Sequence, residues 1–119
     1  YILAAMKPEL LFNVLSDPTR LRALMLIQSE AEVCVCELTH ALQESQPKVS
    51  RHLALMREAG IVESRREGTW IHYRLSSSLP EWARDIIGCS YARLADLATF
   101  RRDAQRLSQM DNRPERVCA

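Results

Sequence analysis

The spacing of apolar residues changes at Gly60 from a helical repeat to strict alternation. Before this glycine, apolar side chains recur every three or four residues, as they do over 47–59. After it, the stretches 61–66 and 69–75 alternate on either side of Glu67-Gly68, which is typical of a β-hairpin. The chain is therefore predicted to be mainly α with one β-hairpin.

Four helices are predicted before the hairpin and one after it, in the order ααααββα. Two starts are marked by a capping residue and a nearby proline, at Asp17-Pro18 and at Ser45-Gln46-Pro47. The third and fourth helices are short and joined by a tight polar turn, as in a helix-turn-helix, and the hairpin that follows is a wing. We expect a winged helix-turn-helix. The predicted helices cover 3–15, 18–29, 34–44, 47–59 and one long stretch from Pro80 to about Arg101.

A chain of 119 residues is the length of one domain. We expect a DNA-binding and dimerisation domain over 1–110 and a polar, flexible tail over 111–119. No apolar run approaches the roughly 18 residues of a membrane span, and no secretory leader is evident, so a cytoplasmic protein is expected.

Enzymatic function has little support in the sequence. Three glycines leave no glycine-rich phosphate loop, and no Ser/His/Asp, paired-carboxylate or nucleotide motif is present. The charge pattern points elsewhere. Although the chain has a net charge of only +1, residues 46–75 carry six basic side chains and three acidic ones. A local basic surface on a nearly neutral protein suits a polyanionic partner.

The four cysteines do not form the pattern of a secreted disulfide framework. Cys34 and Cys36 are separated by one residue, which is an awkward spacing for a disulfide within regular structure. Cys89 is predicted to lie in the middle of the last helix and to pack in the protein core, and Cys118 lies in the tail. Reduced thiols are therefore expected.

Three motifs together resemble the ArsR/SmtB family of metal-responsive repressors. The run 32–38, EVCVCEL, resembles the family's cysteine box. The run 45–57, SQPKVSRHLALMR, resembles its recognition helix, and 68–75, GTWIHYRL, resembles its wing. The match extends over about residues 10–90, and the combination indicates the arsenic-sensing branch. The run 45–57 and the segment 79–83, LPEWA, are most similar to the arsenite repressors of that branch.

This resemblance implies a homodimeric repressor that binds an imperfectly palindromic operator in double-stranded DNA. Gln and Arg side chains at the start of a recognition helix can make bidentate contacts to adenine and guanine, and wing arginines can contact the backbone or the minor groove. For His52, packing in the core is an equal alternative to a phosphate contact. The expected DNA-binding residues are Gln46, Lys48, Ser50, Arg51, His52, Arg65 and Arg66.

The resemblance also implies an inducer, As(III) or Sb(III), bound by the thiolates of Cys34 and Cys36, with no constitutive cofactor. Soft trivalent ions prefer thiolate sulfur. In a regular helix, positions i and i+2 lie about 200° apart, so binding is expected to unwind the first turn of the third helix and release the operator.

The identity of a third ligand stays open. The best-known arsenic sensors carry a third cysteine at the place of Thr39 here. Cys118 is a possible third ligand, but ordering its tail costs about 1–2 kcal/mol per fixed residue. A small thiol or hydroxide could serve instead, so two protein thiols are expected to be sufficient.

Two alternatives use the same cysteine pair. One is a repressor that responds to cadmium, lead or zinc. Its usual additional ligands are missing: the last helix has Asp85 but no histidine, and the N-terminal stretch has no cysteine pair. The other alternative is a redox sensor in which Cys34 and Cys36 are oxidised instead of binding a metalloid.

Overall fold

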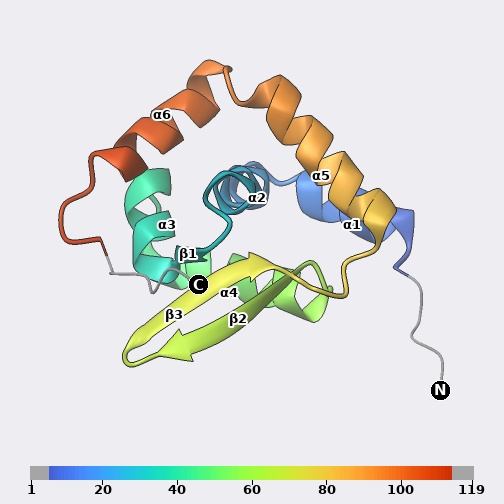
Figure 1. Cartoon of the computed structure of the whole chain (residues 1–119), viewed down its shortest axis with the longest axis horizontal. Coiled ribbons are helices and arrows are strands. Elements are labelled where there is room, and N and C mark those ends of the chain that lie inside the picture. Colours follow the sequence, from blue (N-terminus) through green and yellow to red (C-terminus); the bar gives the residue numbers. More distant parts are fainter. Residues whose placement is uncertain (1–5, 114–119) are drawn as a thin grey trace.

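A computed structural model describes residues 6–113 and confirms the winged helix-turn-helix (Figure 1). The central helix α2 is surrounded by the other helices, with α1 and α5 on one side and α3 and α6 on the other. The hairpin projects from below this bundle. The elements are α1 (Pro8–Leu15), α2 (Pro18–Glu30), β1 (Val33–Cys34), α3 (Val35–Leu42), α4 (Gln46–Glu58), β2 (Val62–Glu67), β3 (Trp70–Leu75), α5 (Glu81–Leu94) and α6 (Ala98–Ser108).

Helix α2 forms the centre of the core because apolar residues occupy most of its circumference. It begins as predicted, with Pro18 in its first turn and the Asp17 carboxylate accepting a hydrogen bond from the Arg20 N–H at 3.0 Å. Helix α4 likewise begins at its predicted cap, Ser45. The buried residues of α2 are Thr19, Ala23, Leu24, Met25, Leu26 and Ile27.

The wing is the predicted hairpin, with a short third strand added to it. Strands β2 and β3 pair antiparallel from Val62 opposite Leu75 to Glu67 opposite Trp70, and Gly68 supplies the positive φ that the turn requires. Strand β1 was not predicted. It pairs with β3, which places Cys34 opposite His72 and gives the sheet order β1-β3-β2.

The prediction of one long helix after Pro80 is wrong. The chain leaves α5 after Leu94 and begins α6 at Ala98. Helix α6 then packs against α3 and α2. Arg106 Nε donates to the Ala41 carbonyl of α3 at 2.7 Å, and the buried Asp103 carboxylate pairs with Arg22 of α2 at 2.7 Å. These contacts are possible only if the chain bends between the two helices.

Two further boundaries differ from the prediction. Helix α1 begins at Pro8, although helix was predicted from residue 3; residues 3–5 lie outside the described part. Of the predicted tail over 111–119, only 111–113 are described. Within residues 6–113, no helix is both long and apolar enough to cross a membrane.

Candidate functional site

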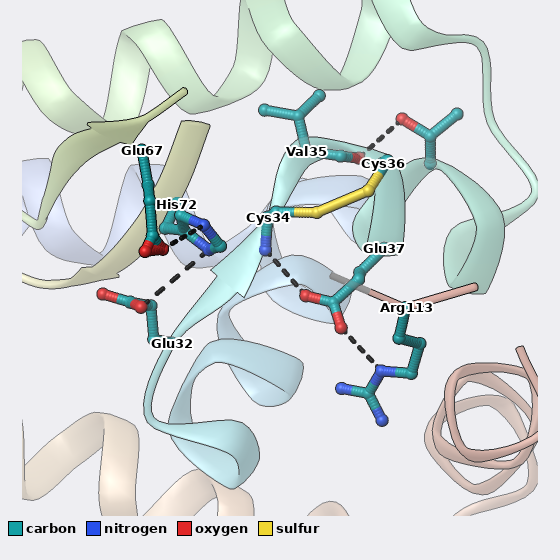
Figure 2. Close-up of a disulfide and its surroundings, with 9 residues drawn as sticks. Glu32, Cys34, Val35, Cys36, Glu37, Glu67, His72 and Arg113 are labelled. Atoms are coloured by element: carbon teal, nitrogen blue, oxygen red, sulfur yellow. Dashed lines mark hydrogen bonds and ion pairs between the residues drawn. A yellow bond between two sulfur atoms is a disulfide. The ribbon is translucent and has the colours of Figure 1, made fainter. Parts of the chain in front are cut away.

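The two thiol groups of the cysteine box lie together where the sheet meets α3. Cys34 is the last residue of β1 and the N-cap of α3, with an extended backbone at φ −88° and ψ 162°. Cys36 lies in the first turn of the helix. Their Cα atoms are 5.5 Å apart, and their sulfur atoms are joined as a disulfide (Figure 2).

This geometry corrects two predictions. The spacing is not awkward for a disulfide, and the two side chains do not point to opposite sides of a helix. Both predictions assumed that the helix includes Cys34. Since Cys34 is extended instead, its side chain is free of the 100° helical rotation, and the sulfur atoms meet without unwinding the first turn of α3.

A buried carboxylate organises the first turn of α3. Glu37 is fully buried, and its Oε1 accepts a hydrogen bond from the Cys34 N–H at 2.9 Å. Its Oε2 accepts from Arg113 Nε at 2.6 Å, and Arg113 also pairs with Glu30 at 2.8 Å. The sequence analysis missed this arrangement, although a glutamate three residues after a capping position is a recognised signal.

His72 lies on the sheet side of the thiol pair. Its side chain is buried, with Nδ1 3.9 Å from Glu32 and Nε2 3.8 Å from Glu67 (Figure 2). The same two glutamates pair with Arg65, whose Nη2 is 2.6 Å from Glu32. The ring therefore lies in a cluster of charged side chains that joins Glu32, the residue before β1, to the hairpin.

A groove runs from the thiol pair to the recognition helix and the hairpin. It encloses a cavity of about 790 Å³, and both cysteines line it. The sequence analysis missed Arg57 and Trp70 as part of this groove. The sequence contained a signal for Arg57, because Gln46, Ser50, Ala54 and Arg57 follow one another at helical spacing and so share one face of α4. The remaining lining residues are Val35, Thr39 and His40 of α3, Gln46, Ser50, Ala54 and Arg57 of α4, and Thr69, Trp70, Ile71 and Tyr73 of the hairpin region.

The predicted DNA-binding residues of α4 occupy different environments. Gln46 and Arg51 are exposed, and Ser50 is half-buried along the groove. The Lys48 Nζ is 3.1 Å from Glu44, which lies in the turn between α3 and α4.

His52 faces α2 rather than the exposed surface of α4. Its Nδ1 lies 3.4 Å from Arg20 Nη1, and its Nε2 lies 3.9 Å from an Asp17 carboxylate oxygen. Burial lowers the pKa of this imidazole and outweighs the opposing effect of Asp17. The contacts fit the packing alternative for this residue.

The two predicted wing arginines also occupy different environments. Arg65 Nε and Nη2 bond both carboxylate oxygens of Glu32, at 2.8 and 2.6 Å, and this bond raises the pKa of the Arg65 guanidinium. The next residue, Arg66, is exposed. Because successive side chains of a strand point to opposite faces, Arg66 points away from this cluster.

Of the other two cysteines, only Cys89 lies in the described part of the chain. Cys89 is exposed on α5, so the prediction of a core position is wrong. Cys118 lies outside the described residues. Within residues 6–113, no group of three or more His, Cys, Asp or Glu side chains is arranged to hold a metal ion.

Comparisons with known proteins place the chain in a family. The family model described as "Bacterial regulatory protein, arsR family" matches residues 17–64. The arsenic resistance transcriptional regulator ArsR1 of Pseudomonas putida is 49% identical over 109 residues, which cover 91% of this chain and 83% of that protein. The arsenical resistance operon repressor of Escherichia coli is 52% identical over 80 residues, which cover 67% of this chain and 68% of that protein.

A comparison with solved structures also finds a regulator of transcription. The crystal structure of the transcriptional repressor BigR from Xylella fastidiosa matches with a TM-score of 0.61 and 34% identity, over 71% of this chain and 82% of that chain. All three relatives are regulators of transcription, which agrees with the prediction that the chain is not an enzyme. The chain belongs to the arsR family of bacterial regulatory proteins.

Proposed function

We propose that this chain is a transcriptional repressor that binds operator DNA when free of metalloid and releases it when As(III) or Sb(III) binds the Cys34 and Cys36 thiolates. The observation that carries this proposal is the meeting of the two sulfur atoms at the start of α3, in the groove beside α4. The arsenic-resistance relatives support the same choice of ligand.

The proposed DNA interface consists of the exposed start of α4 and the hairpin. Gln46 and Arg51 are exposed and suit base recognition, while Lys48 and Arg66 suit contacts to phosphates. Ser50 lies in the groove next to them. Since His52 and Arg65 are engaged within the protein, we assign them a supporting role in holding α4 and the hairpin in place.

The thiol pair connects the two parts of this interface. Cys34 belongs to the sheet through its pairing with His72 in β3, whereas Cys36 belongs to α3, which packs against α4. A metalloid bonded to both sulfur atoms bridges the sheet and the helix-turn-helix. Binding can therefore change how the hairpin is set relative to α4, and DNA binding must oppose metalloid binding to the same extent.

Dimerisation is part of the proposal. Large apolar side chains remain exposed on α1 and α5, including Phe12 at 53% and Trp82 at 37%. A two-fold dimer that covers them presents two recognition helices to an imperfectly palindromic operator. The proposal implies a cytoplasmic location, where such an operator lies.

Arsenite titration of a repressor–operator complex tests the function. The protein is first reduced, because the disulfide must accept two electrons before either sulfur can bind a metalloid. Cys34→Ser and Cys36→Ser are expected to bind the operator and to keep it when arsenite is added. The parent and Cys89→Ser are expected to release it. If Cys34→Ser releases the operator when arsenite is added, the metalloid does not act through the cysteines at the start of α3. Cadmium, lead and zinc serve as competing titrants.

A second candidate function is thiol-based redox sensing, which the Cys34–Cys36 disulfide itself favours. Here oxidation of the two thiols, rather than metalloid binding, changes operator affinity. Mass spectrometry after peroxide and after arsenite distinguishes the two. A redox sensor loses two hydrogens and releases the operator under peroxide alone, whereas a metalloid sensor keeps the operator until arsenite is bound.

A further inference from the structure

We propose that the groove beside Cys34 and Cys36 accepts a small thiol that bears a carboxylate, and that Arg57 binds this carboxylate. The sulfur of the small thiol completes the coordination of arsenic bound to the two cysteines. This inference rests on the proposed function and names a second ligand at the same site.

The thiol pair leaves one arsenic bond unfilled. Trivalent arsenic forms three bonds and prefers sulfur, but the cysteine box supplies two sulfur atoms. Thr39 does not supply a third ligand, because its hydroxyl donates to the Val35 carbonyl of its own helix at 2.8 Å. Within residues 6–113, the one other cysteine, Cys89, is exposed on α5 and does not line the groove.

The groove has room and an apolar wall for a small organic molecule. Its cavity of about 790 Å³ lies within the usual size range of small-molecule sites. Ala54 of α4 and Ile71 of β3 line it, together with Trp70, whose side chain is 41% exposed. These surfaces suit the methylene carbons that separate a thiol from a carboxylate.

The groove is also lined by a cationic side chain. Arg57 lines the groove, and its Nη1 donates to the Tyr73 hydroxyl at 3.4 Å. Tyr73 pairs with Val33 in the sheet, directly before Cys34. Among residues 6–113, Arg57 forms no ion pair with a carboxylate. Its guanidinium therefore keeps donors for the planar, bidentate contact that a carboxylate offers.

The proposed chemistry balances without an external oxidant. Two molecules of small thiol reduce the Cys34–Cys36 disulfide and leave as their own disulfide. Arsenous acid then exchanges its three hydroxyl groups for two protein sulfurs and one small-thiol sulfur. Three As–S bonds form, three As–O bonds break, and the three thiol protons leave with the hydroxyl groups as water.

Arsenite binding without DNA tests this inference. The protein is reduced with a phosphine, which adds no thiol, and arsenite binding is measured by equilibrium dialysis with 3-mercaptopropionate or with 2-mercaptoethanol. We expect the parent to bind arsenite about tenfold more tightly with the carboxylate thiol. Arg57→Gln is expected to lose this preference, and Arg57→Lys to retain part of it. The matched control Arg102→Gln removes an equal charge from exposed α6 and is expected to keep the parent's preference.

The outcomes separate this inference from the proposed function. Tight arsenite binding with no preference between the two thiols overturns the inference alone, as does a preference that Arg57→Gln retains. Loss of arsenite binding in Cys118→Ser also overturns it, because the third sulfur then comes from the chain itself. If the reduced parent binds no arsenite with either thiol, the proposed function fails as well.

Discussion

Arg113 Nε donates to Glu37 Oε2 at 2.6 Å, so the segment that follows α6 is fastened to the first turn of α3 (Figure 2). The other oxygen of Glu37 holds the Cys34 N–H. The buried carboxylate of Glu37 thus joins the backbone of one proposed metalloid ligand to Arg113, which lies 76 positions after Glu37 in the chain. A buried charge of this kind is stable only with such partners.

Arg113→Ala is expected to lower the free energy of unfolding by about 1.5–3 kcal/mol, because it removes a charge-assisted hydrogen bond from buried Glu37. Urea unfolding of the reduced protein measures this change. The control Arg102→Ala, which truncates an exposed arginine on α6, should stay within about 0.5 kcal/mol of the parent. Equal midpoints for the two variants would show that Glu37 does not depend on Arg113.

The two neighbouring wing arginines should behave differently. Arg66→Ala is expected to weaken operator and random DNA binding alike and to reduce the steepness of the salt dependence by about one ion, because exposed Arg66 suits a phosphate contact. Arg65→Ala should mainly destabilise the hairpin, since Arg65 is bonded to Glu32. Fluorescence anisotropy across a salt series, together with urea unfolding, measures both effects. If instead Arg65→Ala weakens DNA binding and Arg66→Ala destabilises the hairpin, then Arg65 is the residue that contacts the DNA.

Arg51→Ala tests the recognition helix itself. Arg51 is exposed on α4, and a bidentate contact to guanine is worth about 1–3 kcal/mol. We expect this loss in operator affinity, together with a relaxed preference at one base pair, in competition binding with operator variants. Random DNA should be bound nearly as well as by the parent. Unchanged affinity and preference would mean that α4 is not the reading helix.

The exposed apolar side chains of α1 predict a dimer interface. Phe12 is 53% exposed and Leu10 is 39% exposed on this short helix. Phe12→Glu is expected to convert a dimer into a monomer in sedimentation at micromolar concentration and to weaken operator binding. Leu55→Glu replaces an exposed leucine of α4 and serves as the control for dimerisation. A parent that sediments as a monomer, with full operator affinity, would contradict the proposed dimer.

Local signals were sufficient to predict most of the fold. Asp17 and Ser45 cap helices by accepting hydrogen bonds from N–H groups three residues later, and Gly68 supplies the φ of +61° in a two-residue turn. These features depend on a few neighbouring residues. A sequence therefore shows them directly, and the winged helix-turn-helix follows from their order.

The features that were missed depend on residues far apart in the chain. The bend between α5 and α6 brings Asp103 to Arg22, 81 positions earlier. Strand β1 exists because two residues pair with β3, almost forty positions later. That pairing extends the backbone at Cys34 and brings its sulfur to Cys36. Periodicity places both cysteines near a helix start, but it does not show that only one of them belongs to the helix.

The cap of α2 predicts a specific acid sensitivity. Partial burial acts to raise the pKa of Asp17, but the hydrogen bond from the Arg20 backbone and the positive charges of His52 and Arg20 outweigh it, and the pKa lies below its ordinary value of 3.8. Because the folded-state pKa is the lower one, this carboxylate stabilises the fold fully above the unfolded pKa. The stabilisation is lost as the pH falls through the folded pKa.

Asp17→Asn keeps a capping side chain but removes its charge. We expect the variant to be less stable than the parent at pH 7, by about 0.5–1 kcal/mol, and the difference to shrink between pH 5 and pH 2.5. Urea unfolding at each pH measures the two curves. Asp85→Asn, on an exposed position of α5, should follow the parent at every pH. Parallel curves for the parent and Asp17→Asn would show that the ionised cap adds no stability, since the parent would then lose nothing extra on protonation.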